Sequence, residues 1–170
     1  MRASMSDGVA HVAFEPGEYN RFTGYICYND GMVEGFAEDA NFSLVTDMGA
    51  TAMVWEDGTW VNGVCDCVHW EGGHWKAGRF LHGIWYDGDW LDGEFDSGIW
   101  VNGAWGGGVF SSAQWRNGVW ADGVFRESCW LNGRWLGGTW DKGIWIDEKT
   151  MFHTLDQELW NITRLKMHFY

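Results

Sequence analysis

An aromatic side chain returns every five residues through the middle of the chain. Between residues 55 and 145 nineteen positions are divisible by five, and eighteen of them hold Trp or Phe, with Cys65 as the exception. Fourteen of the fifteen Trp residues in the 170-residue chain lie on this lattice. The unit reads Trp-x-(Asn/Asp)-Gly-x, as in the pentad 100–104. A sequence with such a period is expected to fold as a tandem-repeat structure.

A longer period of fifteen residues lies within the period of five. The lattice positions that are not Trp fall fifteen residues apart, at Cys65 and at Phe80, Phe95, Phe110 and Phe125, whereas the other two columns are Trp throughout. We predict that all the aromatics form one structural lattice, which consists of Trp55, Trp60, Trp70, Trp75, Phe80, Trp85, Trp90, Phe95, Trp100, Trp105, Phe110, Trp115, Trp120, Phe125, Trp130, Trp135, Trp140 and Trp145. The true repeat is therefore three pentads, one of which differs chemically.

Two all-β architectures fit a period of five. In a MORN-like, open twisted β-meander, each Asn-Gly or Asp-Gly is a type I′ turn between very short antiparallel strands. In a β-solenoid, each pentad is one side of a coil, and the Asn, Asp or Gly position adopts positive φ at the corner. The odd number of pentads in the fifteen-residue period favours the solenoid, because a meander reverses direction at each turn and repeats after an even number.

The corner chemistry and the size of the rings bear on this choice. Val68, Ala113 and Ser128 replace Gly after the Phe column, which indicates a limit on side-chain size there rather than a need for positive φ. Two Trp and one Phe are expected to crowd a coil with five-residue sides. Either the coil is wider than the simplest solenoid or the sheet is an open ribbon, and the sequence leaves this alternative open.

The segments outside the lattice are predicted to cap it, since the terminal edges of a solenoid must be blocked. We divide the chain into a β-rich N-terminal cap at 1–54, the repeat array at 55–148 and a C-terminal cap at 149–170. In the last segment Thr154 and Gln157 resemble a helix N-cap, and Leu155, Leu159 and Ile162 share one helical face. This pattern predicts a short capping helix, with a final strand as the alternative.

The charge excludes several classes of partner. The chain has 24 Asp and Glu against 11 Lys and Arg, a net charge of −13, so direct binding to nucleic acid or to an anionic membrane is not expected. No apolar run reaches the roughly 18 residues of a membrane span, and the first twelve residues lack the apolar core of a signal peptide. We therefore expect a protein partner and no secretion by a signal peptide.

The repeat unit resembles three known repeat families. Trp-x-Asn-Gly-x is similar to the turn half of MORN repeats, and the stretch 22–36, which runs from Phe22 through Asn29-Asp30-Gly31 to Phe36, looks like a degenerate copy of that hairpin. The five-residue beat is similar to that of pentapeptide-repeat (quadrilateral β-helix) proteins, which use Leu or Phe at the centre and four pentads per coil. Over about residues 55–147 the chain resembles tandem Trp-x-x-Gly-x proteins of bacteriophage type. That resemblance implies a virion or phage accessory role, with a location in the virion or the host cytoplasm, and carries over no functional residues.

One cluster has the chemistry of a metal site. Cys65, Cys67 and His69 alternate along the chain, with His74 and His82 downstream, and thiolate and imidazole are the ligands of zinc. The competing interpretation is stronger, because Cys65 occupies a lattice position and reads as a small buried replacement for Phe. We therefore expect no metal and no cofactor.

The carboxylates are better explained by turns than by catalysis. A glycosidase needs two suitably spaced acids, but Asp57, Asp87, Asp92 and Asp122 stand at the turn positions, where Asp tolerates positive φ. No pair is singled out by the repeat. We expect no catalytic residues and no enzymatic activity.

Three functions remain as hypotheses. The first is a non-enzymatic structural or protein-interaction module, such as a decoration, tail or fibre-associated protein of a phage virion, whose partners are copies of itself or other virion subunits. The second is an acidic, rod-like inhibitor or nucleic-acid mimic that binds a basic host enzyme, which requires a continuous acidic stripe. The third is a carbohydrate-binding module, which requires exposed lattice Trp residues.

Overall fold

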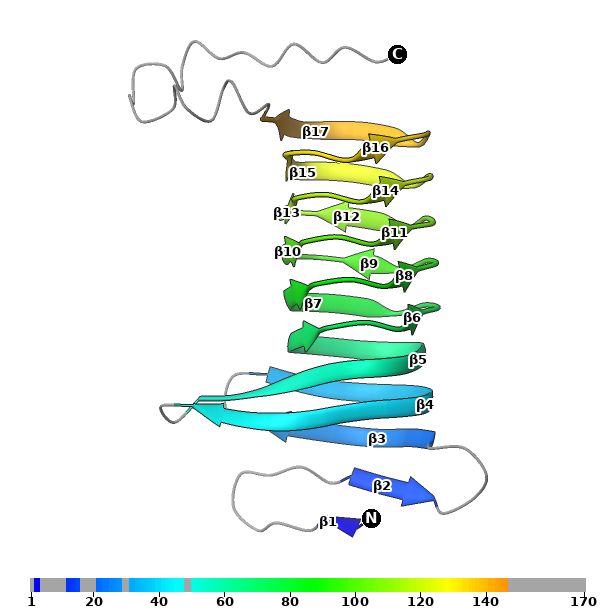
Figure 1. The fold of residues 1–170 in the computed structure, drawn as a ribbon, viewed down its shortest axis with the longest axis vertical. Helices are drawn as coiled ribbons and strands as arrows, with labels where there is room; N and C mark the ends of the chain where they lie inside the picture. The colour runs from blue at the N-terminus through cyan, green and yellow to red at the C-terminus, as the bar shows by residue number, and fades with distance from the viewer. Residues whose placement is uncertain (1, 4–11, 16–20, 29–30, 48–49, 147–170) are drawn as a thin grey trace.

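The fold was analysed in a computed structural model, which describes residues 2–3, 12–15, 21–28, 31–47 and 50–146, with side chains at 31–45 and 52–146. All secondary structure in these ranges is β (Figure 1). The strands are β1 (Arg2–Ala3), β2 (Val12–Glu15), β3 (Arg21–Tyr28), β4 (Gly31–Asp47), β5 (Ala50–Trp70), β6 (His74–Trp75), β7 (Arg79–Trp85), β8 (Asp89–Trp90), β9 (Glu94–Phe95), β10 (Gly98–Trp100), β11 (Ala104–Trp105), β12 (Val109–Ser111), β13 (Ala113–Trp115), β14 (Val119–Trp120), β15 (Val124–Trp130), β16 (Arg134–Trp135) and β17 (Thr139–Trp145).

The repeat array is a parallel β-solenoid in which one coil takes fifteen residues. Each strand from β6 to β15 pairs in parallel with the strand of the preceding coil and with the strand of the following coil, and β16 and β17 pair with the coil before them. The lattice residues keep a register of fifteen: Trp60 is opposite Trp75, Trp85 opposite Trp100 and Phe95 opposite Phe110, and the register shifts locally at Asp66 between β5 and β7. The coils lie one above the other in a column (Figure 1). The solenoid prediction is confirmed, and the antiparallel meander is wrong for the array.

Each coil has three sides, and each side carries one column of inward-facing lattice residues. The Trp60 side contains the column that begins at Trp60, and the Phe side contains the column that begins at Cys65. The Trp70 side contains the column that begins at Trp55 and continues through Trp70. From Trp55 to Trp130 every lattice residue is at most 1% exposed. The residues immediately before and after each lattice position face outward, because side chains alternate along a strand.

Stacking solves the crowding that the sequence suggested. Successive rings of a column are almost parallel, with centroids 4.7 Å apart for Trp70–Trp85 and 4.8 Å for Phe80–Phe95. This spacing is that of adjacent β-strands, about 4.8 Å. Within a coil the rings meet edge to face, as in Trp85–Trp90 at 5.6 Å and 75°. Both arrangements suit the aromatic quadrupole, so three rings fill each layer without a wider coil.

Two of the three corners are built on glycine. At Gly88, φ is +122°, and a methyl group there would lie 2.5 Å from the carbonyl oxygen of Gly73 in the preceding coil. Glycine is therefore required both for its positive φ and for the close approach of the coils. The preceding Asp or Asn does not have positive φ, contrary to the sequence interpretation. Its side chain instead accepts a hydrogen bond from the glycine N–H, 2.9 Å long between Asp87 Oδ1 and Gly88 N.

The third corner, which follows the Phe column, changes its construction from coil to coil. Gly83 and Gly98 have positive φ like the other corner glycines, whereas elsewhere the residue one position earlier does so, at Cys67, Ser112, Glu127 and Lys142. The sequence interpretation that this corner needs no positive φ is wrong, since the requirement has moved by one residue. The side chains of Val68, Ala113 and Ser128 are then buried.

The N-terminal strands are antiparallel and join the array through one long strand. β3 pairs with β4, and β4 pairs with β5, which then continues into the first coil and pairs in parallel with β6 and β7. Phe42 of β4 stacks on Trp55 at 6.1 Å, so it covers the first ring of its column. The predicted helix at 149–170 lies outside the described residues, and the division at residues 54 and 148 stays a prediction.

Candidate functional site

The corner at Cys67 separates the residues of the candidate metal cluster. Cys65 lies in the core and Cys67 is half-buried at the third corner, where its φ is +54°. His69 lies on the Trp70 side, and His74 lies on the Trp60 side of the next coil, where its Nδ1 is 3.1 Å from Asp89 Oδ2. The prediction assumed that residues 65–69 form one regular strand with a common face. The left-handed residue at 67 breaks that alternation.

The Cys65 thiol is held in its neutral form. Burial raises its pKa well above the ordinary value, and the neighbouring Asp66 carboxylate adds to this rise. A neutral, fully enclosed thiol is a poor nucleophile and a poor metal ligand. Its side chain lies below Phe80 in the Phe column, which agrees with its interpretation as a core residue.

The four turn aspartates have one shared structural role. The distance between their Oδ1 and the following glycine N is 2.7 Å at Asp57 and Asp122 and 2.8 Å at Asp92, close to that at Asp87. Asn62 and Asn132 make the same bond. These carboxylates therefore stabilise corners, and their regular spacing along the rod brings no two of them together around a substrate-sized cavity.

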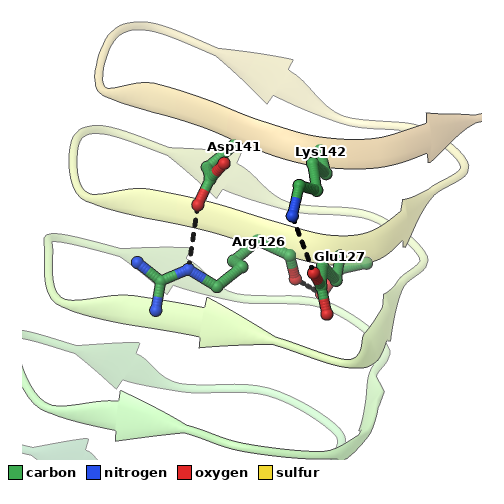
Figure 2. Close-up of polar contacts among 5 residues, drawn as sticks. Arg126, Glu127, Asp141 and Lys142 are labelled. Atoms are coloured by element: carbon green, nitrogen blue, oxygen red, sulfur yellow. Dashed lines mark hydrogen bonds and ion pairs between the residues drawn. The ribbon is translucent and has the colours of Figure 1, made fainter.

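Several other charged side chains pair along the rod axis, fifteen residues apart. Arg79 contacts Glu94 at 2.9 Å. Figure 2 shows two such pairs between β15 and β17: Arg126 Nε lies 3.0 Å from Asp141 Oδ2, and Lys142 Nζ lies 3.3 Å from Glu127 Oε1. All these side chains are about half exposed, so the pairs contribute little to stability. They do neutralise charge on the Phe side and its corner.

The acidic residues of the array form no continuous stripe. Residues 55–99 contain nine Asp and Glu against two Lys and Arg, and residues 100–146 contain three against four. The first half of the rod is thus acidic and the second half is nearly neutral. Within the acidic half, Glu71, Asp89 and Glu94 lie on three different sides.

The lattice Trp residues offer few exposed rings. Eleven of them are at most 1% exposed, and Trp145, in the last described coil, is 39% exposed. The stack also loses its regularity there, because Trp130 and Trp145 are tilted by 45°. A flat sugar-binding platform of several Trp rings is absent from the described array.

The described residues also contain neither a metal-binding cluster nor a membrane-spanning helix. No group of three or more His, Cys, Asp or Glu side chains in this part of the chain is arranged to hold a metal ion. Among the same residues there is no helix with the length and apolarity needed to cross a membrane.

Comparison with known proteins assigns the chain to no family. No protein-family model, no curated protein and no solved structure matches the chain. The resemblance to pentapeptide repeats is supported at the level of architecture, as a β-solenoid with aromatics at a period of five.

One surface feature was missed in the sequence. On the outside of the Trp70 side, the two residues that flank each lattice Trp are mostly apolar, for example Ile84 and Tyr86, or Ile99 and Val101. Aligning the sequence in rows of fifteen would have shown this, because the outward positions of the other two sides are mixed.

Proposed function

We propose that the chain is a non-enzymatic structural and protein-interaction module that acts as a rigid rod. The carrying observation is that the large, fully buried side chains of the array are lattice aromatics in three axial columns, and that the backbone is hydrogen-bonded from coil to coil. Bonds such as Val101 N to Trp85 O (2.7 Å) and Ala104 N to Gly88 O (2.9 Å) recur along the axis. Such a structure presents long, flat sides and is suited to contact with other subunits.

We further propose that the rod is a component of a phage virion, such as a decoration, tail or fibre-associated protein. The support is the likeness of residues 55–147 to tandem Trp-x-x-Gly-x proteins of bacteriophage type, together with the rod-like architecture. Its partners are then copies of itself or other virion subunits, and it is present in the virion or in the host cytoplasm.

The test is quantitative mass spectrometry of purified particles from cells that produce this chain from its own genome. A virion component is expected at a fixed number of copies per particle, comparable with known structural subunits. A replication protein encoded by the same genome serves as the control for contamination. Depletion of the chain from particles to the level of that control, while it is abundant in the lysate, contradicts the proposal.

The acidic-inhibitor hypothesis ranks second. It is favoured by the charge imbalance of residues 55–99, where nine acidic residues stand against two basic ones. The spread of these acids over three sides disfavours a mimic of a nucleic-acid backbone, which needs them in line. Carbohydrate binding ranks third because a single described lattice Trp, Trp145, is more than a third exposed.

A further inference from the structure

Apolar residues occupy the outward positions of the Trp70 side more often than those of the other two sides, although the two most exposed large apolar side chains, Leu91 and Leu136, lie on the Trp60 side. We call the outer surface of the Trp70 side the apolar face and define it by the outward residues on either side of each lattice Trp. From the second coil onward these are His69 and Glu71, Ile84 and Tyr86, Ile99 and Val101, Gln114 and Arg116, Cys129 and Leu131, and Ile144 and Ile146. Tyr86 is 41% and Ile144 39% exposed. The other apolar residues of this face are half-buried, and an apolar strip of this length on the surface marks an interaction site.

In the first coil, Glu56 of this face accepts a hydrogen bond from Asn41 Nδ2 at 2.7 Å. From the second coil onward, two opposite charges interrupt the apolar face. They are Glu71 in the second coil and Arg116 in the fifth, and both are exposed. The other two sides carry axial ion pairs, for example His74–Asp89 and Arg79–Glu94. In the part of the chain that the structure describes, neither Glu71 nor Arg116 forms an ion pair. Arg116 Nε donates to Gln114 Oε1 at 3.0 Å, which holds its guanidinium on this face.

The spacing of these charges matches a two-fold axis. Glu71 and Arg116 are three coils apart, about 14 Å at the strand spacing of about 4.8 Å. A two-fold axis that lies in the interface, perpendicular to the rod axis and midway between these residues, makes the two rods antiparallel, so that Glu71 of each copy faces Arg116 of the other. The same operation places Tyr86 against Val101 of the second copy and Ile84 against Ile99. The apolar residues meet at the centre and the charge pairs flank them, as in an isologous interface.

The parallel arrangement is disfavoured by the same charges. With the two-fold axis along the rod, each coil faces its own copy, so that the two Arg116 side chains lie at the same height. Because residues two apart on a strand are separated by about 7 Å, like charges are then close together, and the same holds for Glu71. Antiparallel pairing separates like charges by three coils and brings opposite charges together.

We infer that the apolar face is the surface through which two copies of this chain associate as an antiparallel dimer, with reciprocal Glu71–Arg116 contacts. This inference rests on the proposed function and names one partner of the module. The matched area is about four coils high and one short strand wide, which is small for a permanent dimer. The dimer is therefore expected to depend on protein concentration and to weaken as salt increases.

The test is sedimentation equilibrium of the full chain over a range of concentrations, with single and double charge reversals. Arg116→Glu places two carboxylates opposite each other at both contacts, and Glu71→Arg does the same with two cations. Each single variant is expected to raise the dimer dissociation constant about tenfold or more. The double variant Glu71→Arg/Arg116→Glu restores opposite charges and is expected to return the constant to within about threefold of the starting value.

A matched control comes from Arg134→Glu, the same substitution at an exposed position of the Trp60 side, which is expected to leave the constant unchanged. The near-UV circular dichroism of the stacked Trp rings checks that every variant is folded. If a reversal fails this check, Tyr86→Lys at the exposed centre of the face takes its place and is expected to abolish the dimer.

The results of the two experiments distinguish a failure of the dimer from a failure of the proposed function. A monomer at all concentrations overturns the dimer, as does a dimer that the charge reversals leave unchanged or that the double variant fails to restore. None of these results affects whether the chain is a stoichiometric part of a particle. Conversely, absence from particles overturns the virion proposal and leaves a measured dimer standing.

Discussion

The glycine corners and the third corner achieve the same turn under different constraints. At the glycine corners the coils approach so closely that a Cβ has no room, and the carbonyl oxygen of the preceding coil lies where a methyl group would be. At the third corner positive φ falls in several coils on an ordinary residue, and the next side chain turns inward. Glycine is therefore required in every coil at two corners, whereas at the third corner Gly83 and Gly98 meet the same limit and other coils place positive φ on an ordinary residue.

The largest expected effect comes from adding one methyl group to a glycine corner. Gly88→Ala places a Cβ 2.5 Å from the carbonyl oxygen of Gly73 and forces alanine to a φ of +122°. We expect a loss of about 3 kcal/mol or more in the free energy of unfolding, measured by urea denaturation. The reverse change at the third corner, Ala113→Gly, is expected to cost only about 1 kcal/mol. Equal losses at the two positions contradict the distinction between the corners.

A moderate effect is expected from the buried hydroxyl of the third corner. Ser128 Oγ accepts a hydrogen bond from Ala113 N at 3.1 Å and donates one to Arg126 O at 2.7 Å. Ser128→Ala leaves a buried N–H without its acceptor, so we expect a loss of about 2 kcal/mol in the free energy of unfolding. Ser111→Ala on the outer surface of the Phe side is the control, with a change below about 0.5 kcal/mol.

A smaller effect of opposite sign is expected where an ordinary residue bears positive φ. Ser112 is exposed and has a φ of +50°. Glycine adopts this conformation without strain, so Ser112→Gly is expected to raise the free energy of unfolding by up to about 1 kcal/mol. The opposite exchange at a glycine corner, Gly118→Ser, is expected to lower it strongly. Destabilisation by both changes would show that φ does not govern the third corner.

The smallest effect is expected from the axial ion pairs in Figure 2. Lys142→Met removes the cation 3.3 Å from Glu127 Oε1. Because both side chains are more than half exposed, the free energy of unfolding is expected to change by less than about 0.5 kcal/mol, and high salt removes the difference. Lys142→Arg keeps the charge and serves as the control. A larger, salt-independent loss would assign the third corner an electrostatic role.

The sequence predicts the architecture well because the lattice repeats with little variation. The fifteen-residue coil, the inward rings and the structural role of Asp57 and Asp122 all follow from period and residue type. The predicted crowding was wrong because it considered the volume of one coil alone. Ring volume is accommodated along the axis, where an indole such as Trp85 stacks almost parallel on its neighbours at about the strand spacing.

Local conformation and surface chemistry were harder to predict. Positive φ was assigned to Asp87 and its equivalents, but it belongs to the glycine, because only the glycine lies against the backbone of the preceding coil. The cluster at Cys65 and Cys67 was treated as a single strand because its composition does not reveal the corner at 67. The apolar face becomes visible only when the coil register brings Tyr86, Val101 and Arg116 onto one surface.

The solenoid depends on a parallel register of fifteen residues between successive coils. An engineered disulfide tests this register directly. Asn117 and Asn102 occupy the same corner of successive coils, where Asn117 Nδ2 lies 3.3 Å from Asn102 Oδ1. The strand spacing of about 4.8 Å lies within the range of Cα–Cα distances that a disulfide can bridge. The double variant Asn102→Cys/Asn117→Cys is therefore expected to form a 102–117 disulfide under mild oxidation, identified by peptide mass spectrometry. Asn102→Cys/Ser112→Cys, whose sites lie at two different corners, is expected to form no such link. A 102–112 disulfide without a 102–117 disulfide would contradict the solenoid.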